Sequence, residues 1–168
     1  MPGEPARIRA ATAADLASIN AIYNREVREG VATWDETPWS SVQRATWFAA
    51  HAGDATQPVL VADAPAGVVG FAYLSLLSLR RGYRFTREDT LYIEPAYQRR
   101  GLGRQLLEAL LAQARAQELH AIVAKIEAGN AASIALHERC GFAVTGRERE
   151  LGFKFGRWLD LVTMQRLL

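Results

Sequence analysis

The sequence predicts one domain of mixed α/β class, and three observations support this prediction. Short runs of branched and aromatic residues, bounded by turn residues, are typical of strands. Between them lie longer segments whose apolar residues recur every three or four positions, as in amphipathic helices. The length of 168 residues is near the usual size of one domain and is enough to bury a sizeable core.

The first half of the chain contains two predicted helices and three predicted strands. Thr12, with Asp15 three residues later, has the spacing of a helix N-cap with a capping box. The segment 63–67 is rich in turn residues, so the strands on either side of it are expected to be antiparallel. The predicted elements are a strand at 8–9, a helix from Thr12 to about Arg28, a helix from Ser40 or Ser41 to near His51, and strands over 59–62 and 68–76.

The second half begins with a predicted strand at 90–93, which Pro95 ends. A helix over 102–117 follows, because six apolar residues form one stripe at helical spacing. These residues are Leu102, Leu106, Leu107, Leu110, Leu111 and Ala114. The last predicted elements are a strand over 121–126, a helix that opens at Asn130 and two closing strands.

The most informative stretch lies between that first strand and the helix. It is Gln98-Arg99-Arg100-Gly101-Leu102-Gly103-Arg104, with two glycines at the start of the helix. A helix N-terminus offers unpaired backbone amides and the positive end of the helix dipole, and the three arginines add charge. We therefore expect an anionic cofactor to bind at this turn through a phosphate group.

Two common nucleotide-binding motifs do not fit this turn. A phosphate-binding P-loop ends in Gly-Lys-Ser/Thr, whereas Arg104 is followed by Gln105. A dinucleotide-binding motif requires a third glycine, and position 106 is Leu. The remaining pattern, Gln-Arg-x-Gly-x-Gly, resembles the pyrophosphate loop of the GNAT acyl-coenzyme A transferases, and every element of that loop is present.

A second segment, Asn130–Phe142, resembles the other coenzyme A motif of this superfamily, in which an Asn opens a helix and Gly-Phe closes it. Asn suits the start of a helix, and Gly141 suits the left-handed position after its end. Three further segments resemble the phosphinothricin and methionine sulfoximine N-acetyltransferase branch. They are 29–34, 86–93 and 154–160, and the whole resemblance covers about residues 8–165 of a single domain over 1–168.

The resemblance implies a GNAT-type domain, with a mixed but mostly antiparallel central sheet, flanking helices, and strands splayed apart at the coenzyme A site. It implies acetyl-coenzyme A (acetyl-CoA) as cosubstrate, attacked directly by an amine in a ternary complex while backbone amides of 91–93 polarise the thioester carbonyl. No covalent enzyme intermediate is expected. The residues expected to bind the cosubstrate are Leu91, Tyr92, Ile93, Arg99, Arg100, Gly101, Leu102, Gly103, Arg104 and Asn130.

Glu88 is the expected general base. It stands two residues before the predicted strand at 90–93, so its carboxylate can face the centre of the sheet. The resemblance points to the same residue. The alternative is a solvated glutamate paired with Arg84 or Arg87. Asp89 is the weaker candidate, because it points to the opposite face if the strand has begun there.

His137 is expected to protonate the departing thiolate, since many superfamily members carry a tyrosine at this position and an imidazole can replace it near neutral pH. The alternative is a histidine that only packs on its helix face. Cys140 is the one cysteine of the chain, so it cannot form an internal disulfide. We expect it to be a buried thiol and not a nucleophile.

The acceptor amine is expected to bind among aromatic and cationic side chains suited to a small anionic amino acid. The candidates are Thr33, Trp34, Ser78, Arg80, Tyr83, Glu88 and Thr90. Arg80, assisted by Arg81 or Arg84, is expected to bind an acceptor carboxylate, and the alternative is a solvated basic loop. Members of this branch usually have Trp followed by Lys or Arg where this chain has Leu77 and Ser78. They usually have Val where this chain has Arg87. The sequence therefore does not determine the identity of the acceptor.

Composition limits the partners. A net charge of +2 gives no argument for nucleic acid, and three scattered histidines have no zinc spacing, so no metal is expected. No apolar run is long enough for a membrane span, and Met1–Glu4 does not open a signal peptide. We expect a cytoplasmic protein that acts on a small-molecule amine.

Several aromatic residues lie near loops, at Trp34, Trp39 and 154–158, and they predict a homodimer. The resemblance implies the same, because members of that branch are homodimers. The alternative is that these rings simply cover the core. Two alternatives to amino-acid acetylation remain. One is acetylation of an aminoglycoside, a polyamine or a peptide N-terminus. The other is a coenzyme A-binding module without turnover.

Overall fold

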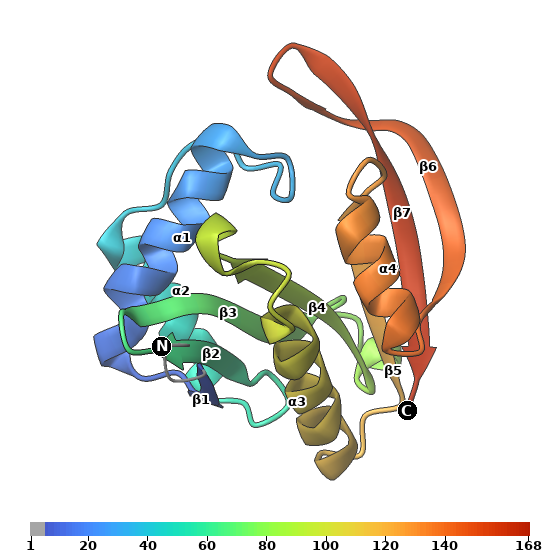
Figure 1. The fold of residues 1–168 in the computed structure, drawn as a ribbon. Coiled ribbons are helices and arrows are strands. Elements are labelled where there is room, and N and C mark those ends of the chain that lie inside the picture. The colour runs from blue at the N-terminus through green and yellow to red at the C-terminus, as the bar shows by residue number, and fades with distance from the viewer. Residues whose placement is uncertain (1–5) are drawn as a thin grey trace.

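The computed structural model describes residues 6–168, so the expectation about Met1–Glu4 lies outside the described residues. The chain forms one seven-stranded sheet with helices on both faces (Figure 1). The strand order is β1-β2-β3-β4-β5-β7-β6. β4 and β5 are parallel, and every other neighbouring pair is antiparallel. The predicted fold class, a mixed but mostly antiparallel sheet flanked by helices, is confirmed.

The strands are β1 Arg7–Ala10, β2 Val59–Ala64, β3 Gly67–Leu76, β4 Thr86–Ile93, β5 Ala121–Glu127, β6 Ala143–Lys154 and β7 Arg157–Leu167. The helices are α1 Leu16–Glu29, α2 Ser41–Ala52, α3 Leu102–Ala116 and α4 Ala131–Arg139. Three short 3-10 turns, which the sequence did not indicate, are η1 Ala13–Asp15, η2 Arg81–Tyr83 and η3 Pro95–Tyr97.

Two apolar clusters hold the helices to opposite faces of the sheet. On one face the predicted stripe of α3 is buried, with Leu106 and Leu110 packed among residues such as Ile122 of β5. On the other face α1 packs Ile19 against Phe71 of β3 and its neighbours. Because successive strand residues point to opposite faces, β2, β3 and β4 supply side chains to both clusters.

The helix starts follow local capping. Asp15 accepts a hydrogen bond from the Thr12 backbone N–H at 2.8 Å, as the predicted capping box requires, and η1 then leads into α1. The Ser40 hydroxyl caps α2 by accepting from the Gln43 N–H at 3.2 Å. Gly67, with φ of +104°, lets β2 and β3 turn tightly, so their connection is shorter than the predicted 63–67 turn.

The predicted start of β4 was wrong. The strand begins at Thr86, four residues before the predicted Thr90. Charged residues have low strand propensity, so the sequence gives no strand signal at Arg87, Glu88 and Asp89. Pairing with β3 on one side and β5 on the other nevertheless holds these residues in the sheet.

A gap opens in the middle of the sheet. β4 and β5 pair from Thr86 opposite Ala121 to Asp89 opposite Ala124, and then separate. The rest of β4 stays paired with β3, and the rest of β5 with β7. Figure 1 shows the β5, β7 and β6 part leaning away from β4. The expected splayed strands are therefore present.

None of the helices in residues 6–168 is both long enough and apolar enough to cross a membrane.

Candidate active site

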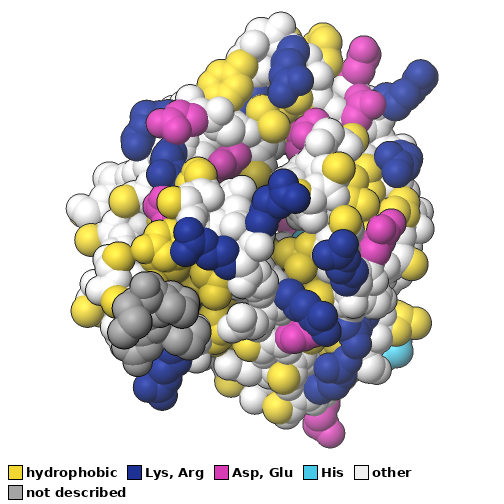
Figure 2. Space-filling view, in the orientation of Figure 1, with side chains coloured by type: hydrophobic (Ala, Val, Ile, Leu, Met, Phe, Trp, Pro, Cys, Tyr) yellow, Lys and Arg dark blue, Asp and Glu magenta, His cyan; other side chains and the backbone are white. Residues whose placement is uncertain are grey.

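A cavity of about 440 Å³ lies in the gap between β4 and β5. Its walls come from both splayed strands, the loop after α1, the first turns of α4, and β7 with the nearby part of β6. In Figure 2 this face of the molecule is hollowed near its centre, and several Lys and Arg side chains surround the hollow. The lining residues are Tyr23, Ala32, Thr33, Trp34, Tyr73, Glu88, Asp89, Thr90, Leu91, Tyr92, Ala124, Lys125, Ile126, Glu127, Asn130, Ser133, His137, Leu151 and Leu161.

The cavity reaches both faces of the sheet, because alternate residues of β4 point to opposite sides. Tyr92 belongs to the cluster under α1, whereas Leu91 packs with the cluster under α3. Glu88 is an even number of residues from Tyr92, so it faces the α1 side. Asp89 faces the α4 side, as expected of a residue inside the strand.

Glu88 lies inside β4, and its side chain is 25% exposed. One carboxylate oxygen is 2.8 Å from the Nζ of Lys125 on β5. The alternative expectation, that Glu88 pairs with Arg84 or Arg87, was wrong. Arg87 is buried, and its Nη1 donates to the Arg84 carbonyl at 3.0 Å. Its Nε donates to the Thr56 hydroxyl at 3.1 Å. Glu88 is thus a reachable carboxylate at the edge of the cavity.

His137 and Asp89 form a buried pair beneath Glu88. His137 Nε2 is 3.0 Å from Asp89 Oδ2, and Nδ1 is 2.7 Å from the Ser133 carbonyl oxygen. The Ser133 carbonyl accepts from Nδ1, and when Asp89 is a carboxylate it accepts from Nε2, an arrangement that favours the imidazolium form. Burial by itself lowers the pKa of His137, but the hydrogen bond and charge of Asp89, with the Ser133 carbonyl, outweigh it and raise that pKa.

Two backbone amides of β4 face the gap. The N–H of Glu94 donates to the Val69 carbonyl, toward β3, at 2.9 Å. Since backbone groups alternate sides along a strand, the N–H groups of Leu91 and Ile93 point the other way, where β5 has already separated. These two donors are available to a ligand that enters the gap between β4 and β5.

The glycine turn shapes the start of α3. Gly101 has φ of +82°, a left-handed conformation that favours glycine, and it is the N-cap of the helix. The first helical hydrogen bond to Gly101 comes from Gln105, so the amides of 102–104 have no partner within the helix. Such a turn fits a pyrophosphate.

Gly103 serves a different purpose from Gly101. A Cβ on Gly103 would lie 3.1 Å from Leu136 Cδ2 and 3.3 Å from Ile93 Cδ1, so its lack of a side chain lets α3 approach both β4 and α4.

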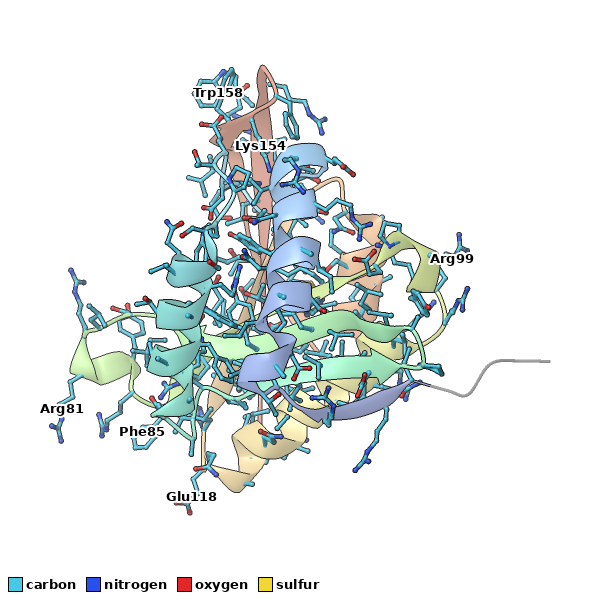
Figure 3. All side chains as sticks on the ribbon, turned by 90° about the vertical axis from the view of Figure 1, so that its left-hand side faces the viewer. Arg81, Phe85, Arg99, Glu118, Lys154 and Trp158 are labelled. Atoms are coloured by element: carbon cyan, nitrogen blue, oxygen red, sulfur yellow. The ribbon has the colours of Figure 1, made fainter. Side chains whose placement is uncertain are left out.

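The arginines of the turn lie at the surface. Arg99 extends into solvent (Figure 3). The guanidinium of Arg100 lies over the Tyr97 ring, 5.1 Å from its centroid. Arg104 pairs with Glu108 one helical turn later, at 2.7 Å. All three are exposed or nearly so, which leaves them accessible to an anionic ligand.

Asn130 opens α4 as expected, because its side-chain oxygen accepts from the Ser133 N–H at 3.0 Å. Gly141, with φ of +82°, follows the end of the helix in the left-handed conformation that was expected. Cys140 is buried, as predicted, and burial raises the pKa of its thiol.

The acceptor candidates divide into two groups. Thr33, Trp34, Glu88 and Thr90 line the cavity. The remaining candidates, Ser78, Arg80 and Tyr83, are not among its lining residues, and Arg80 and Tyr83 are exposed. Their neighbour Arg81 extends away from the rest of the molecule in Figure 3.

A buried lysine that the sequence did not indicate as a site residue bonds the loop that contains Thr33. The Nζ of Lys154, at the end of β6, donates to the Thr33 carbonyl at 2.8 Å and to the Glu26 carbonyl at 3.4 Å. Burial lowers the pKa of this ammonium, against the charge of nearby carboxylates. Beside it, Gly152 leaves room for Trp34, whose ring would lie 2.4 Å from a Cβ at that position.

Among residues 6–168, no group of three or more His, Cys, Asp or Glu side chains is arranged to hold a metal ion.

Comparisons with known proteins agree with this geometry. Residues 8–163 match the family model described as acetyltransferase (GNAT) domain. The L-methionine sulfoximine/L-methionine sulfone acetyltransferase of Pseudomonas paraeruginosa is 48% identical over 161 residues, covering 95% of this chain and 93% of that protein. The phosphinothricin N-acetyltransferase of Alcaligenes faecalis is 41% identical, covering 92% and 78%.

Among solved structures, a GNAT superfamily phosphinothricin acetyltransferase from Sinorhizobium meliloti, in complex with acetyl-CoA, superposes with a TM-score of 0.94. It is 41% identical and covers 98% of this chain and 89% of its own. The family match spans nearly the whole chain. The protein therefore belongs to the GNAT family of acetyltransferases.

Proposed function

We propose that the protein transfers the acetyl group of acetyl-CoA to the α-amine of a small amino-acid-like substrate of the methionine sulfoximine or phosphinothricin type. The observation on which this proposal depends is the position of Glu88, whose carboxylate lies at a cavity that Leu91 also lines. The N–H groups of Leu91 and Ile93 point to the side of β4 from which β5 has separated. The names of the similar proteins support the same substrate class.

Glu88 acts as the general base. An α-amine with a pKa of about 8 is roughly a tenth neutral at pH 7, so the base recovers about one power of ten and also assists attack. The carboxylate, 25% exposed, is accessible to a substrate ammonium and lies in the same cavity as Thr90 and Trp34. These two residues, with Thr33, form the acceptor side of the cavity.

The residues at the glycine turn fit the cosubstrate. The N-terminal amides of α3, the left-handed Gly101 and the exposed Arg99 and Arg100 would hold the pyrophosphate. When bound, acetyl-CoA supplies the activated acetyl thioester. The N–H groups of Leu91 and Ile93 stabilise developing negative charge on a carbonyl oxygen in the gap.

His137 is the proposed source of the proton for the departing thiolate. Its imidazolium form is favoured by Asp89 and the Ser133 carbonyl, so a proton is available near neutral pH. Donation requires the ring to give up one of these two hydrogen bonds.

A thiol-release assay with purified protein and acetyl-CoA tests the proposal. We expect release with methionine sulfoximine, methionine sulfone or phosphinothricin, and none with aminoglycosides or polyamines. Thiol release with the cationic amines alone would support the alternative function, acetylation of an aminoglycoside or a polyamine. Binding of coenzyme A without release for any amine, including free amino acids and peptide N-termini, would support the non-catalytic module.

We also propose that the protein is a cytoplasmic homodimer. The tip of the β6 and β7 hairpin supports dimerisation, because it exposes several large apolar side chains close to the cavity. They are Leu151, Phe153, Phe155 and Trp158.

A further inference from the structure

Lys125 extends from β5 at the point where the two central strands separate. It is the first residue of β5 after the last residue paired with β4, which is Ala124. Its Nζ reaches across the gap to within 2.8 Å of Glu88 on β4. A carboxylate and an ammonium group therefore lie side by side where the two strands separate.

Lys125 is the single Lys or Arg among the described residues that line the cavity. The carboxylates there are Glu88, Asp89 and Glu127, and Asp89 is already paired with His137. The ammonium of Lys125 is therefore the available positive charge for an anionic group in this cavity. The Arg80 cluster, where the sequence placed a carboxylate site, lies outside the lining residues.

The pair between Lys125 and Glu88 can be exchanged for a ligand at low cost. Their side chains are 43% and 25% exposed. Ion pairs this accessible contribute little to stability, because water competes for both charges. Both side chains line the cavity, so either can bind a ligand group instead of its neighbour.

We propose that Lys125 is the specificity-determining residue for acceptors that carry an α-carboxylate. In an α-amino acid the amine and the carboxyl group are bonded to the same carbon, so the molecule presents adjacent positive and negative groups. The amine contacts Glu88 and gives up its proton there, while the carboxylate accepts hydrogen bonds from the ammonium of Lys125. This inference rests on the proposed function, since Glu88 must face the amine.

The test compares an acid with its amide. L-Methionine sulfone and its carboxamide differ only at the carboxyl group, and kcat/KM is measured for both with wild type, Lys125→Met, Lys125→Arg and Arg80→Ala. Arg115→Met, an exposed cation on α3, is the matched control. Amidation also changes the ionisation of the amine, but this effect cancels when the acid-to-amide ratio is compared between variants.

We expect Lys125→Met to lower kcat/KM for the acid by about 10- to 100-fold, the range for a lost charged hydrogen bond, with little change for the amide. Lys125→Arg should keep most of the preference for the acid. The KM for acetyl-CoA should stay unchanged in every variant, which a general loss of structure would not allow. Lys125→Gln serves as a second uncharged variant if the methionine protein does not fold.

Three outcomes would overturn the inference. An unchanged acid-to-amide ratio in Lys125→Met, with wild-type turnover intact, removes the role of Lys125 and leaves the proposed function standing. If Arg80→Ala is the only variant that loses the preference in kcat/KM for the acid over the amide, the carboxylate site lies at the Arg80 loop. Absence of turnover of any amino acid by wild type overturns the proposed function together with the inference.

Discussion

The imidazole of His137 and the carboxylate of Asp89 lie 3.0 Å apart and are nearly inaccessible to solvent, with side-chain exposures of 3% and 2%. The second oxygen of Asp89 is buried and has no hydrogen-bond partner among the described residues. A buried carboxylate in this situation depends on the charge of its neighbour. His137 therefore has a structural task in addition to any role in proton donation.

The pair predicts a loss of stability at high pH. The folded-state pKa of His137 is raised, so its contribution is complete below the unfolded value of about 6.5 and is lost as pH rises through the folded value. Urea unfolding of wild type between about pH 6 and about pH 9 should show this decline. His137→Gln should lack it and should be less stable by about 3–5 kcal/mol below pH 6.5, because Asp89 loses its partner. Parallel curves for the two proteins would contradict the assignment.

Replacement of the proposed base predicts a loss that depends on pH. Glu88→Gln keeps the size of the side chain but cannot accept a proton, so kcat/KM should fall by about 10²-fold near pH 7. The deficit should shrink at high pH, where the substrate amine is already neutral. Glu118→Gln, at an exposed carboxylate beyond the end of α3, is the control. A deficit below about tenfold at every pH would remove Glu88 from this role.

The glycine turn predicts that two substitutions weaken acetyl-CoA binding for different structural reasons. Gly101→Val forces a branched residue to φ of +82°, and Gly103→Val pushes against Leu136 and Ile93. Both should weaken acetyl-CoA binding by at least about tenfold in calorimetry, because the helix amides move. Gly82→Ala is a suitable control, since a Cβ there meets no atom within 4 Å. An unchanged affinity of Gly103→Val for acetyl-CoA would contradict the assignment of this loop to acetyl-CoA binding.

Much of the fold was predictable from the sequence because its signals are local. The stripe of α3, the cap at Asn130 and the left-handed Gly141 each depend on residues a few positions apart. The start of β4 was not predictable in this way, since pairing with β3 and β5 overrides the low strand propensity of three charged residues.

The candidate site was predictable only where a motif marks it. Lys125 and Glu88 are 37 positions apart in the sequence, and only the parallel pairing of β4 with β5 brings them together. A charged residue inside an otherwise apolar predicted strand was the one signal for Lys125. Lys154 had no such signal, because its carbonyl partners lie more than 100 residues away, on α1 and the loop that follows.

Lys154 predicts a variant that affects the acceptor and not the cosubstrate. Lys154→Met removes the ammonium that bonds the Thr33 carbonyl and should cost about 1–3 kcal/mol of stability, because that buried carbonyl loses its donor. The loop with Thr33 and Trp34 lines the cavity, so KM for the acceptor should rise while KM for acetyl-CoA stays the same. Kinetics and urea unfolding measure the two effects. Equal increases in both KM values would indicate a general disturbance of the cavity.

The hairpin tip predicts the oligomeric state. Phe155 and Trp158 are 56% and 60% exposed, and Phe153 packs its ring against Trp158 with centroids 5.1 Å apart. Large apolar side chains gathered at one surface favour contact with another protein, and Leu151 of the same hairpin also lines the cavity. Light scattering at micromolar concentration should therefore report twice the chain mass of 18.5 kDa.

Phe155→Glu should give the monomer and raise KM for the acceptor, since the contact lies beside the cavity. Val42→Glu, at an exposed valine on α2, should leave the dimer intact. A wild-type mass of one chain would count against dimerisation, and a monomeric Phe155→Glu with unchanged KM would separate the dimer contact from the acceptor site.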